Sequence, residues 1–257
     1  RFVGCVAGAQ GGKTIVAAAK FVRRIKRQYL SRKLAGDRRP FVAWVVTPTY
    51  ELATVPQRYL RERWPRGWSD RRAGIYLVCR PYPGVTVKFR SAEHADKLVS
   101  EAVDAIWMNE TARMKAEAWR GGLRMRLNAT GGWMLWDTTP MGRNWVYTDL
   151  YLPSLREGAD EYESEKAHED YSVHRWRTSD NPAVSTSEVE HARATLPAAF
   201  FLREYEADFA AFAGQCWPTF DPLRHVVHHD PDEFAEHILG VDFGYAPEPI
   251  ATLGPDA

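Results

Sequence analysis

The chain has 257 residues, of which 45% are hydrophobic and 26% are charged, and its formal net charge is +1. Length and composition are ordinary for a globular protein with one large domain or two smaller ones, and the near-neutral charge excludes a uniformly basic nucleic-acid clamp. The longest apolar run, residues 41–50, is half of the roughly 20 residues that a membrane helix requires, which excludes a membrane-spanning segment.

Three cysteines, Cys5, Cys79 and Cys216, are widely spaced and odd in number. Such a set predicts reduced, packed thiols in a cytoplasmic compartment rather than a disulfide framework. The chain begins at Arg1, without a methionine or a signal sequence, and its first predicted strand follows at once. We therefore interpret the sequence as a fragment or a trimmed chain.

A glycine-rich loop separates the first apolar run, residues 2–7, from a helical pattern over residues 15–30. Its residues are Gly8, Ala9, Gln10, Gly11, Gly12, Lys13 and Thr14. A strand, such a loop and a helix in this order are typical of a phosphate-binding loop, in which backbone N–H groups and a helix N-terminus converge on an anion. The expected ligand is ATP with Mg²⁺, where Lys13 reaches the β- and γ-phosphates and the Thr14 hydroxyl binds the metal ion.

The loop departs from the usual motif at one position. The motif has Gly six residues before the lysine, where this chain has Ala7. A loop without any ligand is the alternative interpretation, and the Gly-Lys-Thr sequence between a strand and a helix argues against it.

Further apolar, β-branched runs are separated by helical patterns, which predicts a mostly parallel α/β sheet flanked by helices. A turn at residues 81–84 is expected to join two of the runs as a hairpin, a local departure from parallel order. The runs cover residues 2–7, 41–47, 75–79, 85–89, 105–108 and 133–136.

The pattern changes beyond residue 150. Residues 1–150 are expected to form the ATPase core, and residues 151–213 a lid or linker subdomain with a helical run at 186–209. Residues 214–236 are rich in Pro, Asp and His and are predicted to be an interdomain linker. Residues 237–257 then begin a further, incomplete domain. The histidines of the linker lack regular ligand spacing, so a metal cluster is not expected there.

Charge is unevenly spread along the chain. Residues 20–39 hold nine Lys or Arg against one Asp, residues 58–72 hold six Arg against two acids, and residues 157–170 hold seven acids against one Lys. The two basic segments are candidate DNA contacts, although each taken alone is better explained as a solvated surface. Trp64 and Trp68 lie among the arginines of the second segment, where they could stack on bases.

The apolar run at residues 105–108 ends in Asn109 and Glu110, at the edge where open α/β sheets bind ligands. Glu110 is expected to orient and deprotonate the attacking water. Asn109 stands where Asp is common, and as a neutral ligand it is expected to weaken Mg²⁺ binding, so the rate of hydrolysis stays open. Asp104 lies at the other end of the strand and is not expected to replace it.

Another run ends in the sequence Trp136-Asp137-Thr138-Thr139-Pro140. The hydroxyls of Thr138 and Thr139 could sense the γ-phosphate and transmit its loss to neighbouring elements. Taken alone, these residues indicate only a turn after a strand.

Taken together, these residues resemble the large terminase subunit of tailed bacteriophages, the motor that packages viral DNA. The resemblance covers most of the chain in the family's order, and this ordered series is more specific than any single motif. The segments that carry it are residues 8–14, 46–50, 89–93, 109–110, 138–140 with Gly142, 178–182, 196–197 and 204–209.

The resemblance implies a P-loop NTPase of the additional-strand, catalytic-glutamate type, with an extra strand between the loop strand and the strand of Glu110. It implies ATP hydrolysis that translocates double-stranded viral DNA into a procapsid, by a homo-oligomeric ring docked transiently on the portal in the host cytoplasm. The portal protein and the small terminase subunit are the implied partners. In this family Lys13 and Thr14 would hold ATP and Mg²⁺, Glu110 would be the catalytic carboxylate, and Thr138 and Thr139 would form the coupling motif.

The family's trans-acting arginine follows a Leu upstream of the catalytic strand, but here Leu98 is followed by Val99. Arg90 and Arg113 remain as candidate arginine fingers. The family also carries a ribonuclease H-like nuclease that cuts the genome with two divalent metal ions, Mg²⁺ or Mn²⁺. Asp242 resembles the first metal carboxylate of that domain, and the short sequence after it implies that this fragment does not cut DNA.

Two other functions stay open at this point. A neutral Asn109 is consistent with a nucleotide-binding structural subunit that hydrolyses weakly, in which Asn109→Asp would raise activity. A helicase-like ATPase would also use the loop and Glu110, and strand separation would favour it.

Overall fold

The computed structural model describes residues 1–65, 69–73, 76–155 and 168–209. The chain divides into two compact units, Arg1–Gly214 and Gln215–Ala257, and every described residue belongs to the first. The expected linker at 214–236, the expected strand with Asp242, Cys216, Trp68 and most of the acidic stretch 157–170 lie outside the described residues. The expected boundary at residue 150 stays a prediction.

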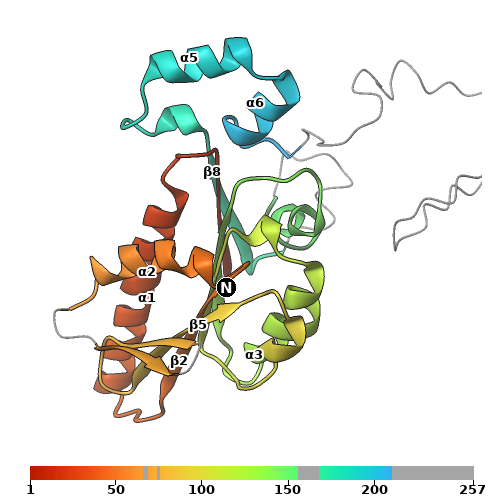
Figure 1. The fold of residues 1–257 in the computed structure, drawn as a ribbon. Helices are drawn as coiled ribbons and strands as arrows, with labels where there is room; N and C mark the ends of the chain where they lie inside the picture. The colour runs from red at the N-terminus through yellow and green to blue at the C-terminus, as the bar shows by residue number, and fades with distance from the viewer. Residues whose placement is uncertain (66–68, 74–75, 156–167, 210–257) are drawn as a thin grey trace, which may run out of the picture. The chain divides into compact units, whose positions relative to one another are not determined.

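A sheet forms the centre of this unit (Figure 1). It has eight strands in the order β3-β4-β5-β2-β6-β7-β1-β8. All neighbours from β5 to β8 are parallel, and β3 and β4 form an antiparallel edge. This confirms the mostly parallel sheet and the hairpin. The strands are β1 (Phe2–Ala7), β2 (Phe41–Thr47), β3 (Ser69–Ala73), β4 (Tyr76–Arg80), β5 (Val85–Ser91), β6 (Ala105–Asn109), β7 (Trp133–Thr138) and β8 (Tyr171–Trp176).

The α-helices are α1 (Lys13–Leu34), α2 (Thr54–Arg61), α3 (Arg124–Arg126), α5 (Thr186–Thr195) and α6 (Ala198–Glu204). The single helical run predicted at residues 186–209 is thus two helices. They are separated at Leu196 and Pro197, because a proline has no N–H to donate and disfavours a helical conformation in the residue before it. Other short helical turns cover Glu51–Ala53, Ala95–Leu98, Thr111–Arg113, Ala118–Leu123, Tyr147–Tyr151, Leu152–Ser154 and Thr178–Asp180.

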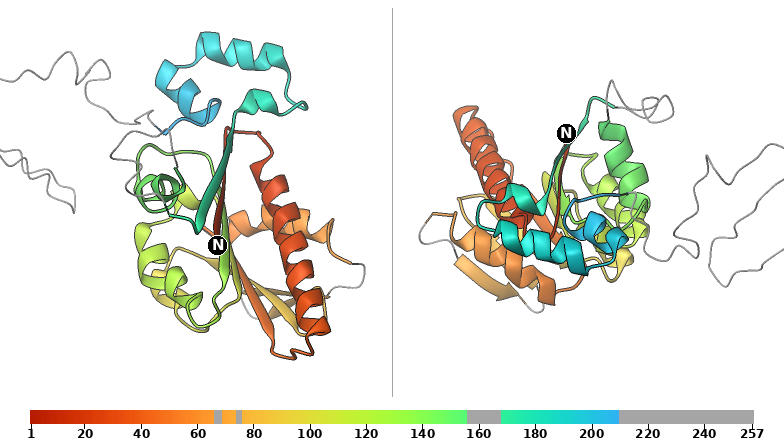
Figure 2. Two further views of the ribbon diagram at one scale, coloured as in Figure 1. Left: turned by 180° about the vertical axis from the view of Figure 1, so that it is seen from behind. Right: turned by 90° about the horizontal axis from the view of Figure 1, so that it is seen from above.

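Helical segments cover both faces of the sheet (Figure 2). On one face α1 packs Phe21 and Ile25 against side chains of β1, β2, β6 and β7. On the other face the segments around Trp119 and Tyr147 cover the alternate side chains of the same strands. Because the central strands are buried on both faces, their sequences are continuous apolar runs rather than alternating ones.

The tryptophans serve mainly as core. Trp44, Trp107, Trp119 and Trp136 are fully buried. Trp64, expected as a candidate stacking residue for bases, is 6% exposed and belongs to the core on the α1 face. That interpretation of Trp64 is therefore wrong, because a side chain packed in the core has no face left for a base. Among the described residues, no helix has the length and apolar character that crossing a bilayer demands.

The strand order determines where the site can lie. β7 separates β1 from β6, so the extra strand expected between the loop strand and the Glu110 strand is present. Because these strands are parallel, their carboxyl ends meet at one edge, and the loop after β1 lies beside the ends of β6 and β7.

Candidate active site

The glycine-rich loop ends in an uncapped helix N-terminus. Gly12 precedes α1 with φ 82°, a left-handed conformation that glycine adopts without steric cost. Among the described residues no side chain caps the helix, and its first turn carries no acidic residue. The first N–H groups of α1 are therefore left for an external acceptor, and the helix dipole favours an anion there.

Side chains of residues 176–206, which lie within the lid or linker subdomain expected at 151–213 and are called the lid segment below, hold three loop carbonyl groups. Since the C=O and N–H of a trans peptide point in opposite directions, these bonds turn the N–H groups of the next residues away from the lid segment. The N–H groups of Gly8, Ala9 and Gly11 already donate to the carbonyl oxygens of Trp176, Glu204 and Gly8. The loop donors that these contacts turn toward a ligand are therefore the N–H groups of Gln10 and Gly12. The contacts, each at 2.7 Å, are Thr178 Oγ1 to the Ala9 carbonyl, Asn181 Nδ2 to the Gln10 carbonyl, and Trp176 Nε1 to the Gly11 carbonyl.

Gly8 is required where the loop meets the lid segment. A Cβ on this residue would lie 2.3 Å from Thr178 Oγ1 and 2.7 Å from the Glu204 carbonyl oxygen, closer than real contacts allow. Ala7, where the motif usually has glycine, is the last residue of β1 and is fully buried in an ordinary strand conformation. Its methyl group therefore creates no conflict with the loop.

Lys13 and Glu110 meet at the head of α1. Lys13 Nζ lies 3.1 Å from Glu110 Oε1, and the two side chains are 12% and 23% exposed. Glu110 follows β6 with φ 55°, an uncommon conformation for a residue with a side chain. Such strain is held by the surrounding structure and is found most often at functional sites. The structure thus brings together the two residues that the sequence predicts to bind phosphate and to activate water.

A buried cluster lies directly beside this pair. Asp137, at the end of β7, is fully buried and accepts three hydrogen bonds from neutral donors. Trp107 Nε1 donates to Oδ1 at 2.6 Å, Asn109 Nδ2 donates to Oδ2 at 2.8 Å, and the Thr14 hydroxyl donates to Oδ2 at 3.4 Å. Parallel pairing of β6 with β7 places Asn109 opposite Asp137.

Burial raises the pKa of Asp137 to about 7. The hydrogen bond from Trp107 opposes this rise, the charge of Glu110 adds to it, and Lys13 and Asn109 oppose it further. Desolvation therefore outweighs the neutral donors, because they stabilise the charged carboxylate less than water does. A cation beside Asp137 would favour the charged form.

Thr138 connects β7 with the turn after Glu110. Its hydroxyl accepts a hydrogen bond from the Ala112 N–H at 3.0 Å and donates to the Thr139 carbonyl at 2.9 Å. Thr138 is fully buried, whereas Thr139 is partly exposed. A displacement of the turn after Glu110 would therefore change the contact between Ala112 and Thr138 at the end of β7. The coupling role of the two threonines stays a prediction.

The candidate arginine fingers occupy different surroundings. Arg113 is 63% exposed, and its Nε lies 3.8 Å from Glu110 Oε2. Arg90 is 13% exposed, stacks on the ring of Trp44, and lies 3.7 Å from Glu101 Oε1. Arg113 is therefore placed at the site of its own chain, and neither position tests a role in a neighbouring subunit.

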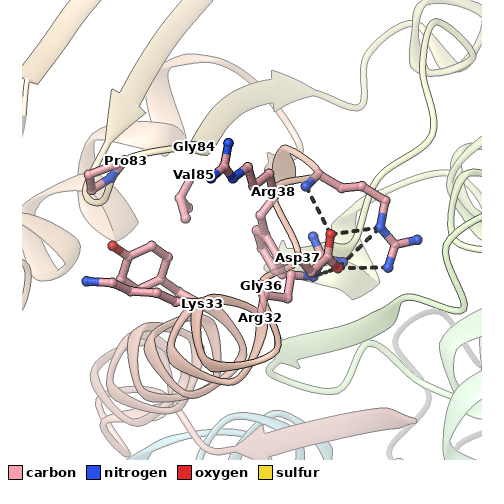
Figure 3. A pocket seen from close by; sticks show the side chains of 11 residues that line it. Arg32, Lys33, Gly36, Asp37, Arg38, Pro83, Gly84 and Val85 are labelled. Carbon is pink, nitrogen blue, oxygen red and sulfur yellow. Dashed lines mark hydrogen bonds and ion pairs between the residues drawn. The ribbon is translucent and has the colours of Figure 1, made fainter.

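A basic cavity of about 360 Å³ lies at the other end of α1 (Figure 3). Lys33, Arg38 and the turn at Pro83 line it, together with Asp37. The Arg39 side chain holds the pKa of Asp37 below its usual range through hydrogen bonds. No element of the phosphate-binding loop reaches this cavity, so it is separate from the candidate active site.

Sequence reasoning missed two parts of the site. From the sequence Asp137 is only a neighbour of Thr138, although an acid directly after the apolar run at 133–136 is a signal of its own. The lid residues Trp176, Thr178 and Asn181 carry no local signal, because their contacts depend on how residues 176–206 pack on the loop.

Comparison with known proteins gives a consistent result. No protein-family model matches the chain. The large terminase subunit of Escherichia phage T5 is 33% identical over 231 residues, which cover 81% of this chain and 48% of the T5 protein. The chain spans about half the length of the curated relatives it matches.

Solved structures share the fold. The ATPase domain of the Thermus phage P74-26 large terminase has a TM-score of 0.64 at 23% identity, covering 81% of this chain and 88% of that domain. The large terminase of another thermophilic bacteriophage, in complex with ADP, has a TM-score of 0.60 at 18% identity, covering 87% of this chain and 52% of that chain. The chain is therefore related in sequence to the large terminase subunits of phages, and it has the fold of their ATPase domains.

Proposed function

We propose that this chain is the ATP-hydrolysing part of a motor that moves double-stranded viral DNA into a procapsid. The observation that carries the proposal is the contact of Lys13 with Glu110 at the uncapped N-terminus of α1, 3.1 Å between Nζ and Oε1. The resemblance to phage large terminase subunits supports the packaging role. A relative of the same fold binds ADP, which supports a nucleotide as the ligand.

The residues of this chain divide the work of hydrolysis. The N–H groups of Gln10 and Gly12, those at the start of α1, and the Lys13 side chain would bind the phosphates and stabilise the charge that develops on them. Glu110 would orient a water molecule and take its proton as the water oxygen attacks the γ-phosphorus and the bond to the β–γ bridging oxygen breaks, which releases ADP and phosphate. Lys13 would exchange its contact with Glu110 for the phosphates, and this exchange would leave the carboxylate available for the water.

The donor set beside Thr14 fits Mg²⁺. This ion prefers oxygen ligands and keeps several of its waters, and the Thr14 hydroxyl and the Asp137 carboxylate supply oxygens at one point, where Asn109 presents its amide nitrogen to both. When bound, Mg²⁺ neutralises charge on the β- and γ-phosphates. Thr138 and Thr139 would transmit loss of the γ-phosphate through the Ala112 contact.

The DNA partner is proposed from one face of α1. Lys20, Arg23, Arg24 and Arg27 line a surface groove together with Gln28 and Ser31. Spacing of three and four residues places these cations on one side of the helix, where they can follow a phosphate backbone. We further propose a homo-oligomeric ring that docks on the portal protein in the host cytoplasm and that receives DNA from the small terminase subunit.

The complete protein is proposed to carry a nuclease as well. Its two divalent metal ions, Mg²⁺ or Mn²⁺, would use Asp242 as one ligand. Asp242 lies outside the described residues, so this part rests on the resemblance alone.

The proposal is tested by the rate of ATP hydrolysis of the complete polypeptide, with and without double-stranded DNA and portal. Glu110→Gln should lower turnover by about 10²–10⁴-fold while ATP-γ-S binding is kept, because the base is lost and the phosphate site is not. Lys13→Ala should abolish both binding and turnover. Hydrolysis at the wild-type rate in Lys13→Ala would contradict the proposal.

The two other functions make different predictions for the same assay. A structural subunit would bind ATP without turnover, and its motivation was the missing acid at Asn109. Asp137 supplies an acid at the same place, 2.8 Å from Asn109, so that motivation is weakened. A helicase-like ATPase would separate strands, whereas the proposed motor moves on intact duplex.

A further inference from the structure

We propose that Asp137, on β7, supplies the carboxylate that holds Mg²⁺ beside Thr14, and that Asn109 is the positioning residue that orients it. This assignment rests on the ATPase function proposed above. It moves the acidic group of the metal site from β6, where the sequence has Asn109, to the neighbouring strand.

The first argument is geometric. Thr14 Oγ1 lies 3.4 Å from both Asp137 Oδ2 and Asn109 Nδ2, so one hydroxyl contacts the ends of β6 and β7 together. Pairing of β6 with β7 places residues 109 and 137 opposite each other. A carboxylate at either position therefore reaches the same hydroxyl.

The second argument concerns charge. Within the part of the chain that the structure describes, the hydrogen bonds to Asp137 come from Trp107, Asn109 and Thr14, which are all neutral. Lys13, the cation on the next helix, is paired with Glu110. A fully buried carboxylate with neutral donors alone is costly, and buried charges are normally paired or coordinate metals.

The third argument explains why residue 109 is neutral. An aspartate there would place two buried carboxylates on opposing positions of adjacent strands, and like charges in such a pair repel. The Asn109 amide instead donates to Asp137 Oδ2 at 2.8 Å and fixes the direction of that oxygen. The pair of one acid and one amide thus carries a single negative charge, whichever of the two strands carries the acid.

The test compares three variants by the affinity for ATP-γ-S, measured calorimetrically in excess Mg²⁺ and in EDTA. The ratio of the two dissociation constants reports the contribution of the metal ion, without any turnover. Mg²⁺ should tighten binding in the wild type, so the dissociation constant in EDTA exceeds that in Mg²⁺. We expect Asp137→Asn to lower the ratio of the EDTA value to the Mg²⁺ value by about 10–100-fold, as loss of a supporting metal contact does. Affinity in EDTA should stay the same or improve, because a negative charge near the phosphates is removed.

Two companion variants make the comparison sharp. The double variant Asn109→Asp/Asp137→Asn returns the acid to β6 and should restore the Mg²⁺ effect to within about threefold of the wild type. Asn109→Asp alone should give no gain in Mg²⁺ affinity and a lower melting temperature. A tenfold gain from Asn109→Asp, or an unchanged ratio in Asp137→Asn, would overturn the proposal.

A measurement on the wild-type protein covers the case in which a variant does not fold. Fe²⁺ replaces Mg²⁺ in the presence of ADP, and with ascorbate and peroxide it cleaves the backbone next to the metal site. Cuts near both Thr14 and Asp137 support the assignment, and cuts near Thr14 without any near Asp137 overturn it. Absence of ATP-γ-S binding to the wild type would instead show that the proposed function itself is wrong.

Discussion

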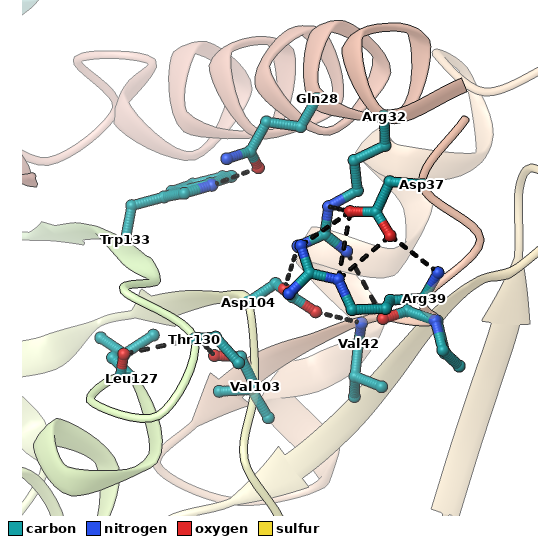
Figure 4. Close-up of polar contacts among 11 residues, drawn as sticks. Gln28, Arg32, Asp37, Arg39, Val42, Val103, Asp104, Leu127, Thr130 and Trp133 are labelled. Atoms are coloured by element: carbon teal, nitrogen blue, oxygen red, sulfur yellow. Dashed lines mark hydrogen bonds and ion pairs between the residues drawn. The ribbon is translucent and has the colours of Figure 1, made fainter. Parts of the chain in front are cut away.

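Two buried aspartates at opposite edges of the same sheet show how charge is handled differently for structure and for ligand binding. Asp104, just before β6, accepts a hydrogen bond from Arg32 Nη2 at 2.5 Å and another from the Val42 N–H at 2.8 Å (Figure 4). Asp137, at the end of β7, accepts its bonds from neutral donors in the part of the chain that the structure describes. The first carboxylate is bonded directly to a cation of the fold, whereas the nearest cation named for the second, Lys13, is paired with Glu110 and acts on Asp137 only through its charge.

This difference assigns roles to the two edges. The Arg32–Asp104 pair fastens the C-terminal part of α1 to the strands, next to the Gln28–Trp133 hydrogen bond. The Asp137 cluster lies at the N-terminus of α1, where an anion and its metal ion are expected. Helix α1 therefore carries a structural ion pair near its C-terminus and the expected phosphate and metal site at its N-terminus.

The largest effect on stability is expected from titration of Asp137 in the metal-free protein. Its pKa is raised by burial to about 7, so the folded state favours the protonated form. The stabilising contribution is complete below about pH 4 and is lost as the pH rises to about 7, at a cost of a few kcal/mol. Because other carboxylates titrate too, the measurement is the difference between the wild type and Asp137→Asn in urea unfolding in EDTA from pH 4 to 7.5.

The outcome for this first comparison is clear in either direction. The wild type should lose free energy of unfolding relative to Asp137→Asn as the pH rises. Parallel pH profiles for the two proteins would contradict the statement that desolvation of Asp137 outweighs its stabilising contacts.

Asp104→Ala should destabilise the protein by about 2–3 kcal/mol at any pH near neutrality, because Arg32 loses its buried partner. The expected cost is below that of a fully buried pair, since the side chain of Arg32 is 25% exposed. Thermal unfolding measures it. Asp37→Ala is the matched control, because Asp37 lies 3.9 Å from Arg32 Nε in the same network but is bonded mainly to the exposed Arg39, so it should lower the melting temperature less. Equal losses in both variants would remove the special role of Asp104.

Gly8→Ala tests the packing of the lid segment on the ligand edge. The added methyl group would meet Thr178 Oγ1 and two backbone carbonyl oxygens, so we expect a loss of about 1–3 kcal/mol and weaker ATP-γ-S binding. Gly121→Ala is the control, because a Cβ there meets nothing within 4 Å. Urea unfolding and calorimetry with ATP-γ-S check both variants. A Gly8→Ala variant with unchanged stability and unchanged ATP-γ-S affinity would contradict the packing of the lid segment on the loop.

The contrast between paired and unpaired charges extends to the cations of α1. Arg32 is held by Asp104, whereas Arg23 and Arg27 are exposed and line the groove on the helix surface. We expect Arg23→Ala/Arg27→Ala to reduce the slope of log affinity against log salt for duplex DNA by about 2, one for each phosphate contact. Lys97→Ala, an exposed cation on another element, should leave the slope unchanged. An unaltered slope in the double variant would exclude α1 as the DNA contact.

The fold followed from the sequence wherever local signals and tertiary demands agreed. Buried parallel strands appear as continuous apolar runs, and the glycine-rich loop before α1 marks the binding edge. β3 was not predicted, because its sequence Ser69-Asp70-Arg71-Arg72-Ala73 is polar and its strand conformation comes from pairing with β4. Pro197 was the overlooked signal that divides α5 from α6.

The candidate site shows the limit more sharply. Lys13 and Glu110 could be paired from the sequence, since each follows a strand that ends at the same edge. The exchange of roles between residues 109 and 137 could not, because it depends on which strands are neighbours and in which register. From the sequence, a neutral residue at position 109 predicts a weak metal site. In the structure, the acid lies on the neighbouring strand, at Asp137.

The most direct test is a crystal structure of the protein with ATP-γ-S and Mn²⁺, in which anomalous scattering locates the metal ion. We expect the triphosphate in the loop at residues 8–14, and the Mn²⁺ peak between the Thr14 hydroxyl and the Asp137 carboxylate, directly or through one water. A metal peak distant from Asp137, or a nucleotide bound away from Lys13, would contradict the account.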